Sequence, residues 1–424
     1  MQLLPYGVSS LLGQVLLAVS VPPLLVYAAR LYLFSLVSLR KRATVEKAAP
    51  DGAERMVSVI VPLFNRAALV DELMARLTSF SWPDYEVIVA DDSHDSSPER
   101  LEKWREDPRV TVVYRPTRRG WKAGALNDAL RSVSPRSDFC LFLDADSLPE
   151  PDLIGRMVSR MEETGADVVQ GAQRPDANAS DSWVSRGLSL VLDGYNLVDL
   201  QARKELGLLI PLTGSNFMMR TGLIRANTFR EDATEDWELT AQLWSKGWKV
   251  VYAPDIAVSG RTTDRVRGLL HRYSLWAGST TADTVSLGGA ILRSRNLRRR
   301  VKLDFFLSGL SYLMSVFVIL AVVGAILVPS PFVGRASTPV LTFSVISALF
   351  VLPAPPISLL VAAHASKTRR SLNSVAMALL GSIVVLPVVA FSSLRGLFRR
   401  GKPVDVKTDA SWVDVDALEA EARD

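Results

Sequence analysis

The stretch "VSVIVPLFN", residues 57–65, opens the polar middle of this 424-residue chain. Its first seven residues form a continuous, largely β-branched run that ends at a proline and an asparagine, which is the pattern of a strand buried on both faces of a parallel sheet. Apolar residues at helical spacing follow over 67–80, and residues 85–93, "YEVIVADDS", read as a second buried strand. Strand, helix and strand in this order begin an α/β sheet.

The same alternation continues for about fifty residues. We expect a helix over 98–106, a strand over 110–114, a helix over 124–133 and a strand over 139–143. All strands of this half are expected to be buried on both faces, so the loops at their carboxyl ends should form the ligand crevice. Three of these loops carry notable polar residues, which are Asn65-Arg66, Asp91-Asp92 and Asp144-Ala-Asp146.

Asp144 and Asp146 follow their strand at spacing i, i+2. In a turn just past a strand both carboxylates can point at one ion, and hard oxygen ligands suit Mg²⁺ or Mn²⁺ bound together with phosphate oxygens. Alternatively, the two acids only cap the next helix, which fits the following "PEP" at 149–151.

Two further segments are candidates for binding a nucleotide. A carboxylate in Asp91-Asp92 can accept hydrogen bonds from a nucleobase or ribose, although a turn explains it equally well. Lys122, with Gly124 and the helix that follows, offers a cation and a helix N-terminus to phosphate. The alternative for Lys122 is a solvated basic loop, "RPTRRGWK".

Thr234-Glu235-Asp236 precedes a helix expected over 237–246, with a strand after it over 249–252. A carboxylate at the mouth of the crevice can act as a general base toward an acceptor hydroxyl. The alternative is that Thr234 caps the helix and the acids occupy its first turn, which the helix dipole favours.

Apolar residues gather at both ends of the chain, and the mean hydropathy is positive. Residues 11–39 contain a single charge, Arg30, and further apolar segments occupy 305–328, 339–363 and 375–391. Each approaches or exceeds the roughly 20 residues that cross a bilayer. We therefore expect an integral membrane protein. A cleaved signal peptide is the alternative interpretation of residues 11–39, but no basic residue precedes that run and no small-residue cleavage site follows it.

Basic residues flank the central polar region on both sides, at 40–42 and 293–302. The positive-inside rule therefore places this region in the cytoplasm, and the single Cys140 fits a reducing compartment, where it would pack as a small core residue. Three full spans after a cytoplasmic domain would put the basic tail outside, against the same rule, so the prolines at 353–356 or 387 could mark a segment that does not cross. The net charge of +5 indicates membrane lipid headgroups and no nucleic acid as the partner, because its clusters adjoin the membrane boundaries.

Taken together, residues 57–278 resemble a membrane-embedded glycosyltransferase of family 2, the inverting GT-A group that includes cellulose, chitin and hyaluronan synthases. The matching pieces, in order, are "VSVIVPLFN", "VIVADDSHD", "WKAGALNDAL", "FLDADSLPEPD", "GSNFMMR", "ATEDWELTAQLWSKGWKVVYAP" and a partial "HRYSLWAGS". The resemblance implies an α/β GT-A domain with a Rossmann-like, mostly parallel sheet, joined to helical transmembrane segments.

The resemblance also implies a role for each motif residue. Asp92 with Asp91 would hold uracil and ribose, with Asn65 beside them, and Lys122 would contact the nucleotide. Asp144 and Asp146 would adjoin the diphosphate, with Asp146 ligating Mg²⁺ or Mn²⁺. Asp236, with Glu235, would be the catalytic base, and the sugar and acceptor pocket would be bordered by Gly214, Ser215 and Asn216. A hydroxyl activated by Asp236 would attack the anomeric carbon of a nucleotide sugar, favoured to be a UDP-sugar, with inversion.

One motif departs from the family. Processive synthases carry Gln-x-x-Arg-Trp, whereas this chain reads Arg272-Tyr-Ser-Leu275-Trp276, which keeps only the tryptophan. Trp276 could be a sugar platform or an anchor at the bilayer interface. Arg272 could supply the missing charge. The change favours transfer of one or a few sugars to a lipid or glycan acceptor over a processive polysaccharide synthase, which stays the alternative.

The expected organisation is an anchor (1–42), a linker (43–55), a GT-A domain (56–260), interface helices (261–303), about three spans (304–397) and a polar tail (398–424). The expected activity is that of a metal-dependent family 2 hexosyltransferase in the cell membrane, with its catalytic domain in the cytoplasm. Two rivals are a polyprenyl-phosphate sugar synthase and a non-catalytic scaffold; the intact acids argue against the scaffold.

Overall fold

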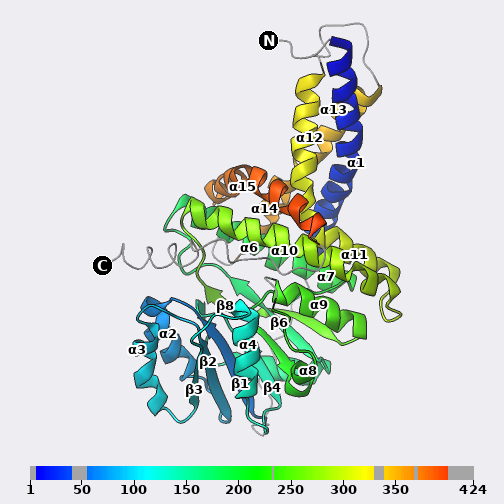
Figure 1. Ribbon diagram of the computed structural model, residues 1–424. Helices are drawn as coiled ribbons and strands as arrows, with labels where there is room; N and C mark the ends of the chain where they lie inside the picture. Colours follow the sequence, from blue (N-terminus) through cyan, green and yellow to red (C-terminus); the bar gives the residue numbers. More distant parts are fainter. Residues whose placement is uncertain (1–5, 41–54, 232–233, 329–338, 367–370, 400–424) are drawn as a thin grey trace.

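The computed structural model of the protein describes residues 6–40, 55–231, 234–328, 339–366 and 371–399. Figure 1 shows an α/β domain below a stalk of helices, with a layer of helices between them. The expected linker lies almost wholly outside the described residues, as does the polar tail.

Eight strands in the described residues form one sheet, in the order β3-β2-β1-β4-β7-β6-β8-β5. They are β1 (Val57–Leu63), β2 (Tyr85–Asp91), β3 (Val110–Tyr114), β4 (Phe139–Phe142), β5 (Ser147–Leu148), β6 (Val168–Arg174), β7 (Phe217–Arg220) and β8 (Val250–Gly260). The first four are mutually parallel, β7 is antiparallel to β4 and β6, and β8 is parallel to β6. The strand β5 is antiparallel to β8. The predicted α/β fold is confirmed, with a mixed sheet whose first half is parallel.

Alternate side chains of β1 enter two separate cores, one on each face of the sheet. Val59 packs with helices α2 (Ala67–Leu77) and α5 (Leu153–Thr164). Ile60 packs on the other face with α4 (Trp121–Arg131) and α9 (Glu235–Lys246). Cys140 in β4 is fully buried in this second core, as expected of a small core residue.

One strand departs from the prediction that all strands of this half are buried on both faces. β3 lies at the edge of the sheet and pairs with β2 alone. Tyr114 at its end is 53% exposed. The sequence run is short and β-branched, so its composition could not distinguish an edge strand from a central one.

The remaining helices lie around the domain and above it. They are α1 (Tyr6–Leu39), α3 (Ser97–Glu102), α6 (Trp183–Gly194), α7 (Gln201–Leu206), α8 (Thr221–Ala226), α10 (Val266–Arg293), α11 (Arg299–Gly309), α12 (Met314–Leu327), α13 (Pro339–Val351), α14 (Ala354–Ala365) and α15 (Leu372–Phe398), with a π-helix η2 (Tyr195–Leu200) and 3₁₀ turns η1 (Lys103–Glu106) and η3 (Ser311–Leu313).

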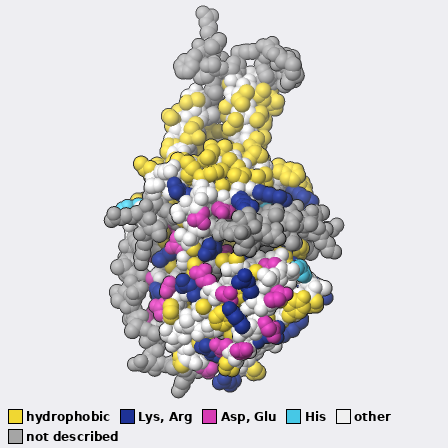
Figure 2. Space-filling view, turned by 90° about the vertical axis from the view of Figure 1, so that its left-hand side faces the viewer, with side chains coloured by type: hydrophobic (Ala, Val, Ile, Leu, Met, Phe, Trp, Pro, Cys, Tyr) yellow, Lys and Arg dark blue, Asp and Glu magenta, His cyan; other side chains and the backbone are white. Residues whose placement is uncertain are grey.

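Three helical stretches are long and apolar enough to cross a membrane: 10–39, 342–365 and 372–398. A fourth candidate is the pair α11 and α12, which is bent by 50° at η3. In Figure 1, α1, α12 and α13 stand together as the stalk. Figure 2 shows hydrophobic side chains gathered over this stalk, whereas Asp and Glu side chains appear only on the part below it. All four predicted apolar segments are therefore helical.

Helix α15 lies across the top of the α/β domain, over α10 and α6 (Figure 1). Its glycine contacts show how close it comes: a Cβ on Gly396 would meet the Gly278 carbonyl oxygen at 2.5 Å, and one on Gly187 would meet the Met377 backbone at 2.7 Å. Small residues at such crossings let helix backbones approach one another closely. Both halves of α15 thus pack closely on other helices, one on α6 and one on α10.

Candidate active site

The carboxyl ends of β1, β2 and β4 bring the three polar loops to one edge of the sheet. Leu63, the last residue of β1, pairs in register with Asp91 of β2. Just beyond, Asn65 has a left-handed backbone (φ +48°), its Oδ1 accepts a hydrogen bond from the His94 amide at 2.8 Å, and its own amide donates to the Ser93 hydroxyl at 2.9 Å. Asn65 therefore fastens the first loop to the second.

Lys122 lies where three segments meet. Its ammonium nitrogen is 2.6 Å from the Asp144 carboxylate and 3.3 Å from the Glu235 carboxylate, and it donates to the Gly214 carbonyl at 3.0 Å. Burial opposes the charge on Lys122, but the nearby carboxylates outweigh burial and raise the pKa of its ammonium. This lysine stays cationic and draws α4, the Asp144 loop and the start of α9 together.

Asp146 is the second acid of the predicted metal loop and is partly buried. Burial and the neighbouring charge of Asp144 raise the pKa of its carboxyl, while the charges of Arg66, Arg272 and Lys122 oppose this rise. Two carboxylates and three cations thus act on one small region. Arg66 and Arg272 come from segments about two hundred residues apart, and both lie near enough to Asp146 for their charges to act on its carboxyl.

Asp236, in the first turn of α9, has a carboxyl pKa near neutrality. Burial, followed by the charge of Glu235, raises the pKa of its carboxyl to about 7. Its Oδ1 accepts a hydrogen bond from the Trp237 amide at 2.7 Å. The neighbouring Glu235 is 6% exposed and paired with Lys122, so Asp236 is the better placed of the two acids to exchange a proton.

The loop predicted to border the substrate pocket contacts these groups directly. Gly214 has a left-handed backbone (φ +76°), and a Cβ there would lie 3.1 Å from the Lys122 nitrogen and 3.3 Å from Asp236 Oδ2. The Ser215 hydroxyl accepts from the Asp144 amide at 2.9 Å. Asn216 is fully buried and donates to the Ala172 carbonyl at 2.8 Å, so it holds the loop from beneath.

Asp91 and Asp92 are both buried at the end of β2. Asp91 Oδ1 accepts from the Ser93 amide at 3.0 Å, and its Oδ2 has no hydrogen-bond partner in the structure. Asp92 is ion-paired with Arg115 and lies 4.0 Å from Arg118. The sequence analysis did not predict these arginine partners, which belong to the stretch "RPTRRGWK". The acidic pair at the end of the preceding strand was the feature that could have indicated them.

Trp276 lies on α10 and is half-buried. Its ring contacts Tyr273 edge to face, with 5.5 Å between centroids. Its role as sugar platform or interface anchor stays a prediction.

Among the described residues, no group of three or more His, Cys, Asp or Glu side chains is arranged to hold a metal. A metal at Asp144 and Asp146 would take its other ligands from the substrate and water, as Mg²⁺ commonly does.

The mixed sheet with an acidic loop after β4 has the GT-A fold. Residues 58–226 match the family "Glycosyl transferase family 2". The part of the chain that matches this family model is joined to helices that are candidates to span a membrane.

Curated relatives agree with this assignment. Glucomannan 4-beta-mannosyltransferase 7 of Arabidopsis thaliana is 25% identical over 253 residues, which are 57% of this chain and 46% of the relative. Probable glucomannan 4-beta-mannosyltransferase 3 of Oryza sativa subsp. japonica has the same identity and coverage. This chain thus spans about half of the length of the curated relatives that it matches.

The solved structures supply a similar fold over nearly the whole chain. Mannosyltransferase PcManGT from Pyrobaculum calidifontis, in complex with GDP-Man and Mn²⁺, has a TM-score of 0.56 and 20% identity, and the match covers 91% of this chain and 99% of that one. The likeness therefore extends from the GT-A domain into the helices above it.

Proposed function

We propose that this protein is a membrane-associated, inverting hexosyltransferase that moves a sugar from a nucleotide-sugar donor to a lipid or glycan acceptor. The observation that carries the proposal is the meeting of Lys122, Asp144 and Gly214 with the two acids at the start of α9. Cation, metal-ligand candidates and a base candidate lie together at the carboxyl edge of the sheet, where ligands bind α/β folds.

Asp236 would act as the general base. A carboxyl with a pKa of about 7 is half ionised at neutral pH and can accept the proton of an acceptor hydroxyl during attack. The oxygen would attack the anomeric carbon on the face opposite the diphosphate, which converts an α-linked donor into a β-linked product. Lys122 would counter the negative charge on the diphosphate as it leaves.

The loop residues fit a divalent cation. The carboxylates of Asp144 and Asp146 are close enough for one to raise the pKa of the other, and carboxylate oxygens are the ligands that Mg²⁺ and Mn²⁺ prefer. Asp146, with Asp144, would hold the ion, which when bound offsets the charge of the departing diphosphate. Arg272 would supply further positive charge there.

The donor is proposed from two lines of support. The sequence resemblance favours a UDP-sugar, with Asp91 and Asp92 at the base and ribose. The curated relatives are named as mannosyltransferases, and the structural neighbour was solved with GDP-Man. We therefore include GDP-mannose as the competing donor.

A processive polysaccharide synthase is the second candidate function. The names of the glucomannan mannosyltransferase relatives favour it, whereas the altered motif from Arg272 to Trp276 speaks for short products. Either activity would take place at the cytoplasmic face of the cell membrane, with membrane lipids as partners of the apolar helices.

The test uses detergent-purified full-length protein with Mn²⁺ or Mg²⁺ and a panel of UDP- and GDP-sugars. Nucleotide release is followed with and without membrane lipid extract, and products are sized by mass spectrometry. Release that requires lipid and yields glycolipid supports the proposal, and lengthening polymer supports the synthase alternative. No release with any donor, in protein whose far-UV circular dichroism shows a folded chain, contradicts both.

The pH dependence follows from the raised pKa of Asp236. Because a base works only when deprotonated, kcat/KM should fall as the pH drops below about 7 and reach a plateau above it. Glu235→Gln removes a neighbouring negative charge that helps to raise this pKa, so it should move the acidic limb to lower pH. The matched control is Glu162→Gln on the surface of α5; equal limbs in all three proteins would contradict the assignment.

Gly214→Ala tests the substrate loop. The left-handed backbone is strained for alanine by about 1–2 kcal/mol, and the added methyl would press on Lys122 and Asp236. We expect kcat/KM to fall about tenfold or more. Gly165→Ala is the control, since Gly165 is also left-handed (φ +58°) but has nothing within 4 Å of the added carbon. Equal losses in the two variants would mean that the Gly214 contact is unimportant.

A further inference from the structure

Arg30 stands inside the apolar run of α1, in the candidate span 10–39. A charged residue in such a segment is costly unless it is paired, and it commonly marks a functional position. Neither donor binding nor base catalysis uses this arginine. It lies at the end of α1 nearer the α/β domain, so the question is what it contacts there.

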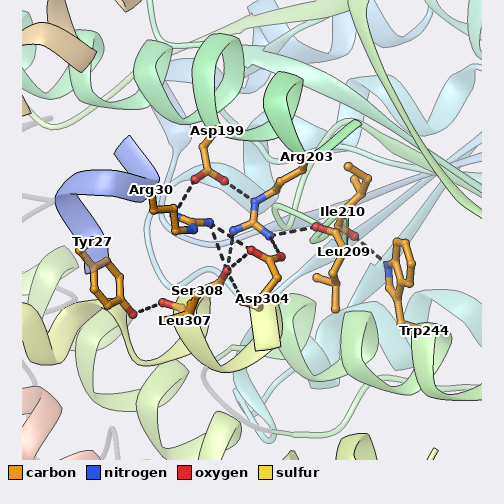
Figure 3. A network of polar contacts seen from close by, with 10 residues as sticks. All are labelled: Tyr27, Arg30, Asp199, Arg203, Leu209, Ile210, Trp244, Asp304, Leu307 and Ser308. Atoms are coloured by element: carbon orange, nitrogen blue, oxygen red, sulfur yellow. Dashed lines mark hydrogen bonds and ion pairs between the residues drawn. The ribbon is translucent and has the colours of Figure 1, made fainter. Parts of the chain in front are cut away.

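Figure 3 shows Arg30 at one side of a four-membered charge cluster. Its Nη1 is 3.2 Å from Asp199 of η2, and its Nη2 is 3.4 Å from Asp304 of α11. Arg203 of α7 pairs with the same two acids, at 2.6 Å from Asp304. The cluster thus joins α1 to three other helical segments with two positive and two negative charges.

Arg203 carries the cluster into the α/β domain. It is only 2% exposed, and its Nη1 donates to the Leu209 carbonyl at 3.0 Å while its Nη2 donates to the Ser308 hydroxyl at 2.5 Å. The Leu209 carbonyl belongs to the segment 207–216, which we call the substrate loop because it ends at Gly214 and its neighbours. One guanidinium therefore holds the membrane-side helices and this loop together (Figure 3).

The substrate loop is bonded in turn to the helix that carries the base. The Ile210 carbonyl accepts from Trp244 Nε1 at 3.1 Å, and the Leu212 amide donates to the Thr240 hydroxyl at 2.8 Å. Thr240 then donates to the Asp236 carbonyl at 2.7 Å. A continuous set of contacts runs from α1 to the first turn of α9.

Ion pairs of this kind are poor sources of stability, because apolar side chains of similar volume often replace them without loss. What such ion pairs supply is a fixed relative position of the segments that they join, since the planar guanidinium accepts few arrangements of its partners. Through Arg203, a shift of α1 would therefore act on the substrate loop at Leu209.

We propose that Arg30 and Arg203 are positioning residues that fix the substrate loop relative to the membrane helix α1. This inference rests on the proposed function. An acceptor that arrives from the membrane must meet both Asp236 and a donor held at the sheet. The cluster sets the distance between the membrane helix α1 and the substrate loop beside Asp236. Misplacement by about 1 Å can cost a reaction two orders of magnitude.

The test is Arg203→Lys in the full-length protein. Lysine keeps the charge but has a single nitrogen, so it cannot serve Asp199, Asp304 and the Leu209 carbonyl together. The matched control is Arg160→Lys, because Arg160 also forms a partly buried ion pair with two hydrogen bonds, to Asp255, and does not touch the loop. For each variant the measurements are kcat, donor KM, melting temperature and hydrogen exchange at the Leu212 and Thr213 amides.

We expect Arg203→Lys to lower kcat about tenfold or more, to leave the donor KM within about twofold of the parent value, and to speed hydrogen exchange at both amides. Arg160→Lys should lower the melting temperature by a similar amount but change neither kcat nor the exchange rates. Equal kcat losses in the two variants, or a rise in donor KM alone, would overturn the proposal. The exchange rates need no activity, so they test the cluster even if the proposed transfer fails. If Arg203→Lys does not fold, Arg30→Lys takes its place, with a smaller change of the same kind expected.

Discussion

Asp236→Asn is expected to lower kcat by about 10²- to 10⁴-fold, the usual share of general base catalysis. Asparagine has nearly the same shape but cannot accept the proton of the attacking hydroxyl. It can still accept the hydrogen bond from the Trp237 amide, so the start of α9 should stay in place. The measurement is initial-rate kinetics at saturating donor and acceptor, with the donor Kd determined by calorimetry.

The donor Kd should stay within a few fold of the parent value, because the proposed role of Asp236 is to act on the acceptor hydroxyl. Asp255→Asn is the control: this acid is also enclosed and ion-paired, with Arg160, but lies outside the site. A variant Asp236→Asn that keeps parental kcat would assign the base to another residue, with Glu235 the next to be tested.

Asp146→Ala is expected to abolish the response to Mn²⁺ or Mg²⁺ and to lower kcat/KM by about 10³-fold or more, since a metal contributes several kcal/mol of charge stabilisation. Removal of this acid leaves Asp144, which is already engaged by Lys122, as the remaining carboxylate of the loop. Metal binding is read by Mn²⁺ electron paramagnetic resonance in the presence of UDP or GDP.

Asp152→Ala serves as the control for net charge, because Asp152 is an exposed acid just beyond the loop. It should bind Mn²⁺ as the parent does. Undiminished Mn²⁺ binding and activity in Asp146→Ala would contradict the role of this loop and would leave the two acids with the capping role that the sequence also allowed.

The strands and the acidic loops could be predicted from sequence because both are local features. A buried parallel strand has a recognisable composition, and the carboxyl ends of parallel strands must share an edge. That reasoning placed Asp144 and Asp146 correctly at the carboxyl edge of the sheet. It could not see that Lys122 bridges this loop to Glu235, since that contact joins segments more than a hundred residues apart.

The arginines of the site were missed for a related reason. Arg115 and Arg118 appeared as members of a basic loop, and a basic loop in water has the same composition as one folded onto two buried acids. Arg30 was visible as the single charge of an apolar run, but its partners come from η2 and α11. Sequence spacing carries no information on such meetings.

Hydropathy likewise predicted apolar helices but not their placement. Residues 372–398 are apolar enough to cross a membrane, yet α15 packs along α10 and α6. The glycines that permit this packing, Gly187 and Gly396, carry no signal in a hydropathy profile.

The measurement that most directly tests sugar transfer at this site follows nucleotide release and the anomeric proton of the product together, by NMR, in purified protein with Mn²⁺, donor and membrane lipid extract. We predict one nucleotide released for each new linkage, a β-configured product from an α-linked donor, and loss of both signals in Asp236→Asn. An α-configured product, or linkages that form at the parental rate in Asp236→Asn, would contradict inverting transfer with Asp236 as the base.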